Sequence, residues 1–349
     1  MKDLPLTRDE MIRVIEGKGA ARRVPIAVQP WVAADRFGAR TEEVRQLLND
    51  YPCDIQRIDL RIPAVFDAPA DDPGYRWMNT DNPFPPSTPL DAVTALEDWD
   101  DWDAIAADFP NPSYPGLIPQ NAPAPDGHYR VALWWYWLFE RHWSLRGMEN
   151  ALCDYYEYPE EVHKLYRALT DFYKAAVTRA HDELGVDAIW TSDDIGTQTG
   201  PFFSPEIFDE FFAPYYKELV EHCHSLGMHF WMHCCGNIEI LLPRLIELGI
   251  DVIHPIQKYT MDEKTIAAAH GGKICFWAGF DVQRIIPYGT PEEVREEVRF
   301  MLDTYQRPEG RLILAAGNNM TPDTPVESLL ALLDEALVYG KKICANDSV

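Results

Sequence analysis

The sequence predicts an α/β protein built as a (β/α)8 TIM barrel. Short runs rich in β-branched and aromatic residues alternate with longer helical patterns, which is typical of βα units around a parallel sheet. Eight such runs are present, which is the strand number of this barrel. Glycine-containing turns, such as the one at Gly185, lead from three helical patterns into the next run and indicate repeated αβ units. An open, doubly wound sheet is the alternative architecture.

The predicted strands are spaced so that a helix fits between most neighbours. In chain order they cover residues 24–30, 54–61, 130–137, 188–193, 228–235, 251–255, 274–279 and 312–316. Helix starts are predicted where Ser or Thr precedes a proline, because the hydroxyl caps the first turn and proline fits the first helical position. This pattern occurs at Ser204, Thr290 and Thr324.

A long segment rich in proline and aspartate, residues 62–129, separates the second and third predicted strands. Loops of this length are unusual inside a compact domain, so a disordered linker between two domains is one reading. Aromatic residues such as Tyr75, Trp77, Phe84, Trp99 and Trp102 favour packing instead. We therefore expect one domain over residues 1–349, with 62–129 as an excursion over the barrel mouth, where βα loops lie.

Composition narrows the classes of function. A formal net charge of −25 disfavours nucleic acid and anionic membranes as partners. No apolar run reaches the roughly 18 residues that a membrane helix needs, and the N-terminus lacks the apolar stretch of a signal peptide. The seven cysteines do not form a disulfide framework. These features predict a cytoplasmic protein, and a homodimer is compatible with them.

The sharpest chemical feature is His233-Cys234-Cys235-Gly236 at the end of the fifth predicted strand. Barrel enzymes place catalytic groups at this end of a strand. Residues two apart on a strand point to one face, so His233 and Cys235 point together and Cys234 points away. Imidazole and thiolate are zinc ligands. The pair is interpreted as part of a catalytic zinc site, against the alternative of a core histidine beside a buried cysteine.

Acidic and imidazole groups at neighbouring strand ends are the next candidates. A catalytic zinc needs about three protein ligands, and His254 is the best third ligand by position, with a substrate-contacting or ligand-orienting role as its alternative. Asp193 and Asp194 end the fourth strand and Asp281 ends the seventh. Each can position substrate, orient a ligand or act as a general acid, although helix capping is the simpler role.

Amide and indole groups complete the predicted mouth. Asn318 and Asn319 follow the eighth strand, where they can bind a ligand or form a turn. Trp135 is a candidate cofactor contact at the end of the third strand, with core packing as its alternative. No dinucleotide fingerprint, P-loop or nucleophile elbow occurs, so nucleotide cofactors are not indicated.

The runs SDDIGTQTGPFFSPEIFDEFF, FWMHCCGNI and FWAGFDVQRIIPYGTPEEVREEVR resemble the uroporphyrinogen decarboxylase superfamily, and the similarity extends from about residue 130 onward. The resemblance implies a (β/α)8 barrel and one of two activities. One branch decarboxylates porphyrinogens and carries an arginine-rich segment after the first strand. Here that stretch keeps Arg36 and Arg40 without the motif, and Asn318 stands where decarboxylases have a histidine.

The chain also resembles the other branch, which contains methylcobalamin:coenzyme M methyltransferases and ether demethylases. The methyltransferases of this branch bind zinc through H-x-C and a later cysteine. His233 and Cys235 match the H-x-C, but residues 316–318 contain no cysteine. Another zinc spacing of the superfamily, E-x14-E-x20-H, places Glu218, His233 and His254 in register, with histidine at its middle position. His254 or an acid is then expected to supply the missing ligand, with a weakly held or absent metal as the alternative.

The resemblance favours zinc-dependent transfer of a methyl group between a small molecule (an ether, amine or thiol) and a corrinoid. Because the chain lacks a D-x-H-x-x-G motif, the cobalamin is expected on a separate corrinoid protein. A decarboxylase of a tetrapyrrole or other carboxylate is the first alternative. A barrel that binds a ligand without catalysis is the second.

Overall fold

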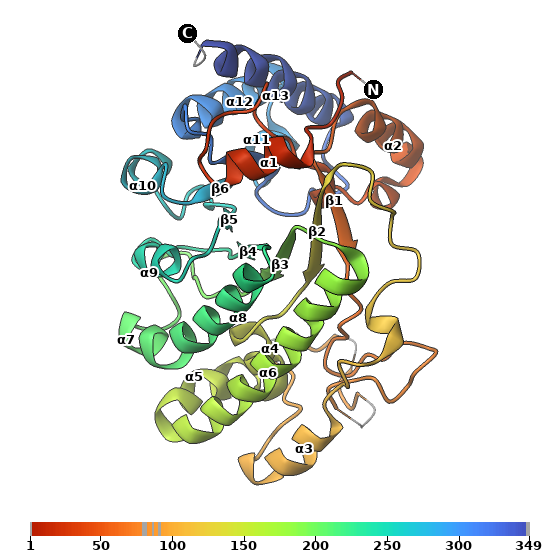
Figure 1. Cartoon of the computed structure of the whole chain (residues 1–349), viewed down its shortest axis with the longest axis vertical. Helices are drawn as coiled ribbons and strands as arrows, with labels where there is room; N and C mark the ends of the chain where they lie inside the picture. Colours follow the sequence, from red (N-terminus) through yellow and green to blue (C-terminus); the bar gives the residue numbers. More distant parts are fainter. Residues whose placement is uncertain (1, 79–81, 86, 90–91, 347–349) are drawn as a thin grey trace.

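The computed structural model describes residues 2–78, 82–85, 87–89 and 92–346. Its centre is a curled parallel sheet of seven strands that pair in chain order (Figure 1). The strands are β1 (Ile55–Asp59), β2 (Tyr129–Trp134), β3 (Ala188–Ser192), β4 (His229–His233), β5 (Val252–His254), β6 (Cys275–Phe280) and β7 (Leu312–Ala316). Because all neighbours are parallel, the carboxyl ends of the strands share one edge of the sheet.

Helices surround this sheet, with α12 and α13 at one end of the molecule and α4, α5 and α6 toward the other (Figure 1). The helices are α1 (Arg8–Ile15), α2 (Thr41–Asp50), α3 (Trp102–Asp108), α4 (Phe139–Arg146), α5 (Met148–Glu157), α6 (Pro159–Arg179), α7 (Pro205–Ile207), α8 (Ala213–Ser225), α9 (Leu242–Glu247), α10 (Glu263–His270), α11 (Ile285–Tyr288), α12 (Pro291–Tyr305) and α13 (Val326–Asn346). Ser204 and Thr290 cap α7 and α12 as expected, and Thr290 forms a capping box with Glu293. Val326, two residues after Thr324, begins α13.

Seven of the eight predicted strands are confirmed, with boundaries that differ by at most three residues. The prediction for residues 24–30 is wrong as a strand. Only Ile26 forms a bridge there, to Leu314, and Gln29–Trp31 is a short 3-10 helix. The physical reason is that Pro25 and Pro30 lack the N–H groups that a strand ladder requires.

The segment around Ile26 nevertheless lies between the two edges of the curled sheet. On one side the Ala27 N–H donates to the carbonyl of Leu314 over 2.9 Å. On the other side the Asp54 N–H, next to β1, donates to the carbonyl of Ile26 over 2.8 Å. The Leu314 N–H also donates to the carbonyl of Pro25 over 2.9 Å, so a few hydrogen bonds bridge the sheet on both sides where an eighth strand was expected.

The segment between β1 and β2 packs against the helices through its aromatic side chains, as its composition predicts. Trp77 is fully buried, and its ring contacts Phe172 of α6 with the centroids 5.1 Å apart. Trp99 donates from its indole nitrogen to Asp154 of α5 over 3.1 Å. Asp154 is buried, yet hydrogen bonds from Arg146 and His142 outweigh this burial and lower its pKa to about 2. A buried carboxylate thus ties this segment to α5.

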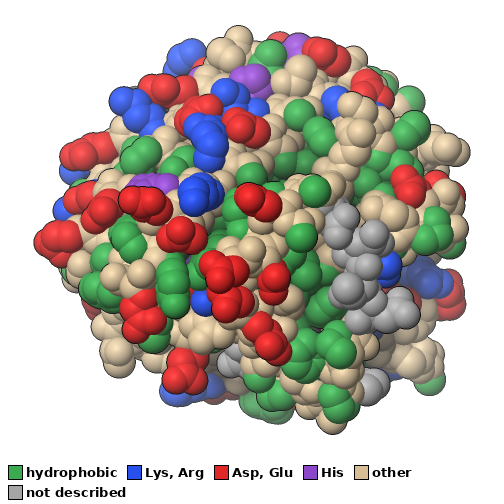
Figure 2. Space-filling model, turned by 90° about the horizontal axis from the view of Figure 1, so that it is seen from below, with side chains coloured by type: hydrophobic (Ala, Val, Ile, Leu, Met, Phe, Trp, Pro, Cys, Tyr) green, Lys and Arg blue, Asp and Glu red, His purple; other side chains and the backbone are tan. Residues whose placement is uncertain are grey.

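The surface is strongly acidic, in keeping with the net charge of −25. Figure 2 shows aspartate and glutamate side chains spread across much of one face, with few basic groups among them. Among the described residues, no helix combines the length and the apolar character that crossing a bilayer requires.

Candidate metal centre

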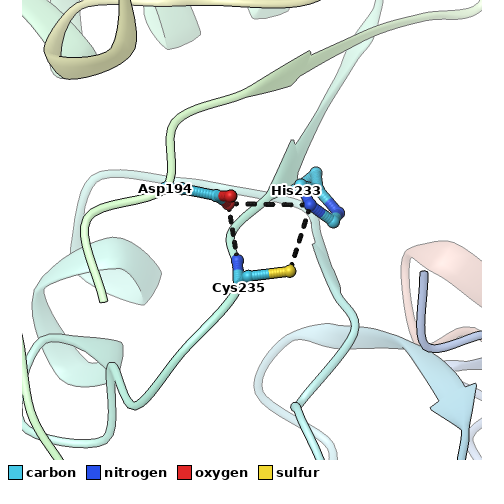
Figure 3. Close-up of side chains that lie close together, drawn as sticks. All are labelled: Asp194, His233 and Cys235. Carbon is cyan, nitrogen blue, oxygen red and sulfur yellow. Dashed lines mark hydrogen bonds and ion pairs between the residues drawn. The ribbon is translucent and has the colours of Figure 1, made fainter. Parts of the chain in front are cut away.

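Three side chains that can bind a metal meet at the carboxyl edge of the sheet: Asp194, His233 and Cys235 (Figure 3). Their donor atoms all lie within 4.8 Å of one another. The Cys235 sulfur is 3.4 Å from Nε2 of His233, and that nitrogen is 3.6 Å from Oδ1 of Asp194. Carboxylate, imidazole and thiolate are all zinc ligands, and three protein ligands with an open position are typical of a catalytic zinc. The donor set therefore fits zinc.

The alternation of side chains along extended backbone explains why these three residues meet. His233 ends β4, so Cys235 returns to the same side two residues later, while the Cys234 side chain is buried on the other side. Asp194 follows β3 in the same way, and its Oδ1 accepts a hydrogen bond from the Cys235 N–H over 2.7 Å. Adjacent parallel strands thus deliver the carboxylate and the H-x-C pair to one point.

A chain of hydrogen bonds sets which nitrogen of His233 carries the proton. The His254 Nε2 lies 2.9 Å from the carbonyl oxygen of Ala316, which can only accept, so this nitrogen is the donor. Burial lowers the pKa of His254 well below its usual value, so the ring is neutral and its Nδ1 is an acceptor. His233 Nδ1, 2.7 Å away, must then donate to it. His233 Nε2 is left with a free lone pair directed toward Cys235 and Asp194.

Aromatic rings enclose this imidazole pair. Trp31 stacks on His254 with the ring centroids 4.2 Å apart and the planes 5° from parallel. Trp135 meets His233 edge to face at 5.5 Å. Burial also lowers the pKa of His233, and it raises the pKa of the Cys235 thiol, with the charge of Asp194 adding to the rise. Without a cation the site therefore favours a neutral imidazole and a protonated thiol, and a metal that binds there would displace the thiol proton.

Two glycines allow the turns after β3 and β4 to approach each other. Gly236 has φ +88°, and a Cβ on it would lie 2.4 Å from the carbonyl carbon of Gly196. The Asn237 N–H donates to the Thr197 carbonyl over 2.7 Å and joins the same two turns. Both contacts involve backbone atoms. Cys235 can therefore lie this close to Asp194 only because residues 196 and 236 are glycines and have no side chain.

Replacing Gly236 by alanine is therefore expected to destabilise the protein by about 3 kcal/mol or more, because a positive φ and a backbone clash act together. Gly227→Ala is the matched control, since Gly227 has φ +76° but open space around its Cβ position. We expect about 1–2 kcal/mol for Gly227→Ala. Free energies of unfolding in urea measure both. Equal losses would show that the close approach of the turns contributes nothing.

The amide and indole candidates border the cluster. Asn318 donates from Nδ2 to the Cys235 sulfur over 3.4 Å, at the place where the family resemblance leads one to expect the later cysteine, the third ligand of that pattern. A small pocket of about 60 Å³ opens beside Cys235, lined also by Gln257, Asp281 and Asn318. Asn319 and Trp135 line a second, wider depression that also holds Arg36 and Arg57. The Arg57 guanidinium is paired with Asp59, with their closest atoms 2.6 Å apart.

Two of the predicted acids are helix caps. Asp193 is fully buried and accepts from the N–H groups of residues 138–140 at the start of α4, and from the Tyr216 hydroxyl over 2.6 Å. Burial raises the pKa of Asp193 to about 6 despite these bonds. Asp281 accepts from the N–H groups of residues 283–285 at the start of α11. Of the acids expected to act at the site, the structure brings only Asp194 to the cluster.

The structure corrects both residues that were expected to complete the zinc site. His254 uses both ring nitrogens in hydrogen bonds, so it supports His233 and has no lone pair left for a metal. Glu218 lies on α8, where it pairs with Arg167 and Lys174 of α6 at 2.6 and 2.8 Å. These hydrogen bonds, that of Arg167 foremost, lower its pKa to about 2. Its match to a zinc spacing is a coincidence of helix position.

Sequence reasoning assigned no site role to three residues around the cluster. Trp31 stacks on His254. The sequence feature that could have identified Trp31 is its place directly after the first predicted strand. Gln257 accepts from the Gly236 N–H over 2.6 Å, and no motif marks it. Glu140 follows the third predicted strand, accepts from the Ser192 hydroxyl over 2.5 Å and is buried. Burial and the nearby charge of Asp194 raise the pKa of Glu140 well above its usual value.

Fold and site together define an α/β protein with a candidate Asp-His-Cys metal centre at the carboxyl edge of a curled parallel sheet. The chain belongs to the uroporphyrinogen decarboxylase (URO-D) family, whose model matches residues 143–338, more than half of its length. This match agrees with the resemblance expected from residue 130 onward.

Two curated relatives are named methylcobamide:CoM methyltransferase MtbA, one from Methanosarcina acetivorans and one from Methanosarcina mazei. Each is 27% identical over 175 residues, which is 49% of this chain. The chain matches only about half the length of these relatives. A solved structure of a methyltransferase from Methanosarcina mazei has the same fold, with a TM-score of 0.62 and 13% identity over 96% of this chain and 99% of that one.

Proposed function

We propose that this protein is a zinc-dependent methyltransferase that moves a methyl group between a small molecule and a corrinoid held by a separate protein. The observation that carries the proposal is the cluster of Asp194, His233 and Cys235, whose donor atoms lie within 4.8 Å of one another. The methyltransferase names of the matched relatives support the reaction class.

The proposal treats the curled sheet as a closed (β/α)8 barrel in one domain, with the segment around Ile26 in the eighth strand position. The hydrogen bonds of this segment to Leu314 and Asp54 support that view. Residues 62–129 would then form part of the barrel mouth, where a corrinoid protein would dock. The carboxyl ends of the strands are where barrel enzymes hold their reacting groups.

Within this site, His233 would bind zinc through Nε2, Cys235 through its sulfur and Asp194 through a carboxylate oxygen. Bound zinc would supply a Lewis acid that lowers the pKa of a thiol acceptor or polarises a methylated heteroatom. Asn318 would donate a hydrogen bond to the Cys235 sulfur and moderate its charge. Burial raises the pKa of Glu140 well above its usual value, which favours its protonated form, so this group would hold a proton beside Asp194.

Metal analysis tests the proposal directly. After supplementation with zinc and dialysis, we expect about one zinc per chain in the wild-type protein and in Cys234→Ser. Cys235→Ser is expected to hold much less, because a hydroxyl replaces the thiolate. Cys234 is the matched control, since it is the neighbouring thiol and its side chain is buried away from the cluster. A wild-type protein that retains no zinc would exclude this function.

A decarboxylase needs several arginines at the mouth to hold a polycarboxylate. The wide depression beside Trp135 contains Arg36 and Arg57, but Asp59 already neutralises Arg57. The geometry therefore favours methyl transfer. Activity that survives complete removal of zinc would reverse this preference.

A further inference from the structure

A pocket of about 170 Å³ lies at the end of β2, between residues 64–67 and the start of α4. Its walls are mostly apolar and aromatic, with Val65, Phe66, Tyr136 and Trp143 among them. One cation, Arg141, also lines it. Tyr136 follows Trp135, whose ring contacts His233, so the loop after β2 forms a wall of both this pocket and the metal centre.

Arg141 is a buried cation that forms no ion pair within the described part of the chain. Arg141 is 1% exposed to solvent. Its Nε and Nη1 atoms have no hydrogen-bond partner among the residues that the structure describes. Nη2 makes a long bond of 3.3 Å to the carbonyl of Pro63. Buried charges in proteins are normally paired, because an unpaired charge loses its hydration without compensation. Two other buried arginines, Arg23 and Arg146, pair with Asp54 and Asp154 in this way, whereas Arg130 forms no ion pair among the described residues.

Neighbouring groups do not replace the missing anion. The guanidinium carbon lies 4.3 Å from the ring centroid of Trp77 and 5.3 Å from that of Tyr136, so aromatic rings cover the guanidinium. Cation–π contacts stabilise the charge but leave in-plane N–H donors unused. Glu140 is next in the chain, but its carboxyl group accepts from the Ser192 hydroxyl over 2.5 Å, and it forms no ion pair with Arg141 among the described residues. Asp67 lines the pocket from an exposed position and forms no ion pair with Arg141 in the described part of the chain.

The backbone of this wall is held in an unusual conformation. Tyr136 has φ +68°, in the left-handed region that a bulky residue rarely adopts. The Tyr173 hydroxyl, on α6, donates to the carbonyl of Tyr136 over 2.8 Å and fixes it there. Backbone strain of this kind is concentrated at ligand sites, so it supports a preformed wall.

The size and chemistry of the pocket point to one class of ligand. An engineered cavity of about 150 Å³ accepts a benzene ring, so this pocket has room for one. Aromatic walls fit the faces of a planar ring, and the two unpartnered nitrogens of Arg141 fit an oxyanion. We propose that this pocket binds a small aromatic carboxylic acid with its carboxylate on Arg141. This assignment deepens the proposed function, on which it rests, by making a methylated aromatic acid the substrate.

Binding of benzoate and of its neutral counterpart benzamide to zinc-free protein, measured by calorimetry, tests the assignment. We expect the wild-type protein to prefer benzoate by about tenfold or more, because a hydrogen bond to a charged group is stronger than one to a neutral group. Arg141→Gln is expected to lose this preference. Arg130→Gln is the matched control: Arg130 is a buried arginine at the other end of β2 that also has two unpartnered nitrogens and lies outside this pocket.

Thermal unfolding shows whether each variant is folded. Should Arg141→Gln not fold, Phe66→Ala replaces it, and weaker binding of both compounds is then expected because the ring loses a wall. Absence of benzoate binding to the wild-type protein, or equal affinity for benzoate and benzamide, overturns the assignment. This readout needs neither zinc nor a corrinoid. Failure here with normal zinc content would therefore leave the proposed function standing. Benzoate binding by a wild-type protein that retains no zinc after supplementation would refute only the proposed function.

Discussion

Replacing His233 by alanine is expected to remove stoichiometric zinc and to lower methyl transfer by at least about a thousandfold. The imidazole supplies the one lone pair whose direction is set by neighbouring residues, through the bonds from His233 to His254 and from His254 to the carbonyl of Ala316. A metal that acts as a Lewis acid contributes several kcal/mol to a transition state, and about 4 kcal/mol corresponds to this factor. Zinc content and the transfer rate with methylcobalamin as methyl donor are the two measurements.

A graded result is expected from His254→Phe. Phenylalanine preserves an aromatic ring against Trp31 but cannot accept the proton of His233 Nδ1. Residues that orient a metal ligand typically change metal affinity about 10- to 100-fold, so this variant should bind zinc more weakly but still measurably. His181→Ala is the control, because His181 is partly exposed and pairs only with its neighbour Asp182. If His254→Phe binds zinc as tightly as the wild type, His254 does not orient His233.

The second large effect is expected on stability, from Asp54→Asn. Asp54 and Arg23 are both fully buried, and two hydrogen bonds of 2.6 and 2.8 Å join them. Asp54 also accepts from the N–H groups of Leu6 and Ile26. It therefore holds the segment around Ile26, the closing segment between β7 and β1, beside β1. Breaking one partner of a buried pair costs about 3–5 kcal/mol. Asp3, 3.3 Å from Arg23, can compensate in part, so we expect a loss near 3 kcal/mol.

An exposed pair provides the comparison for this prediction. Asp334 pairs with Lys2 at 3.0 Å, and its side chain is 39% exposed. Asp334→Asn is expected to change the free energy of unfolding by no more than about 1 kcal/mol, because solvent screens the pair. Urea denaturation of both variants gives the two values. Similar losses would mean that the Arg23–Asp54 pair does not hold the closing segment.

Most of the sheet could be predicted because strands such as β2, β3, β6 and β7 are buried along their whole length and consist largely of apolar residues. The helix starts at Ser204 and Thr290 were also predictable, since capping depends on residues only three positions apart. The first strand was not, because its apolar pattern concealed the effect of Pro25 and Pro30. Hydrophobic patterns report burial, whereas strand formation also requires a free N–H at each pairing position.

The candidate site was also predictable only where it depends on residues close together in the chain. The pairing of His233 with Cys235 follows from a period of two along one strand and needs no tertiary information. The third donor does not, because Asp194 lies on another strand and Asp193 beside it is an equally good candidate by sequence. In the structure Asp193 accepts hydrogen bonds from the start of α4 as a helix cap, and Asp194 is the acid that joins the cluster.

The sequence by itself determined seven of the eight predicted strands, the helix starts at Ser204 and Thr290, which strand end carries the H-x-C pair and which family the chain resembles. All of these depend on residues close to one another in the chain. Only the tertiary structure decided that Asp194 joins the cluster, that His254 supports His233, and that Glu218 pairs with Arg167 and Lys174. It also decided that Arg141 has no ion pair with any residue that the structure describes. These outcomes depend on side chains brought together from distant segments, where burial and competition for hydrogen-bond partners select among residues of the same type.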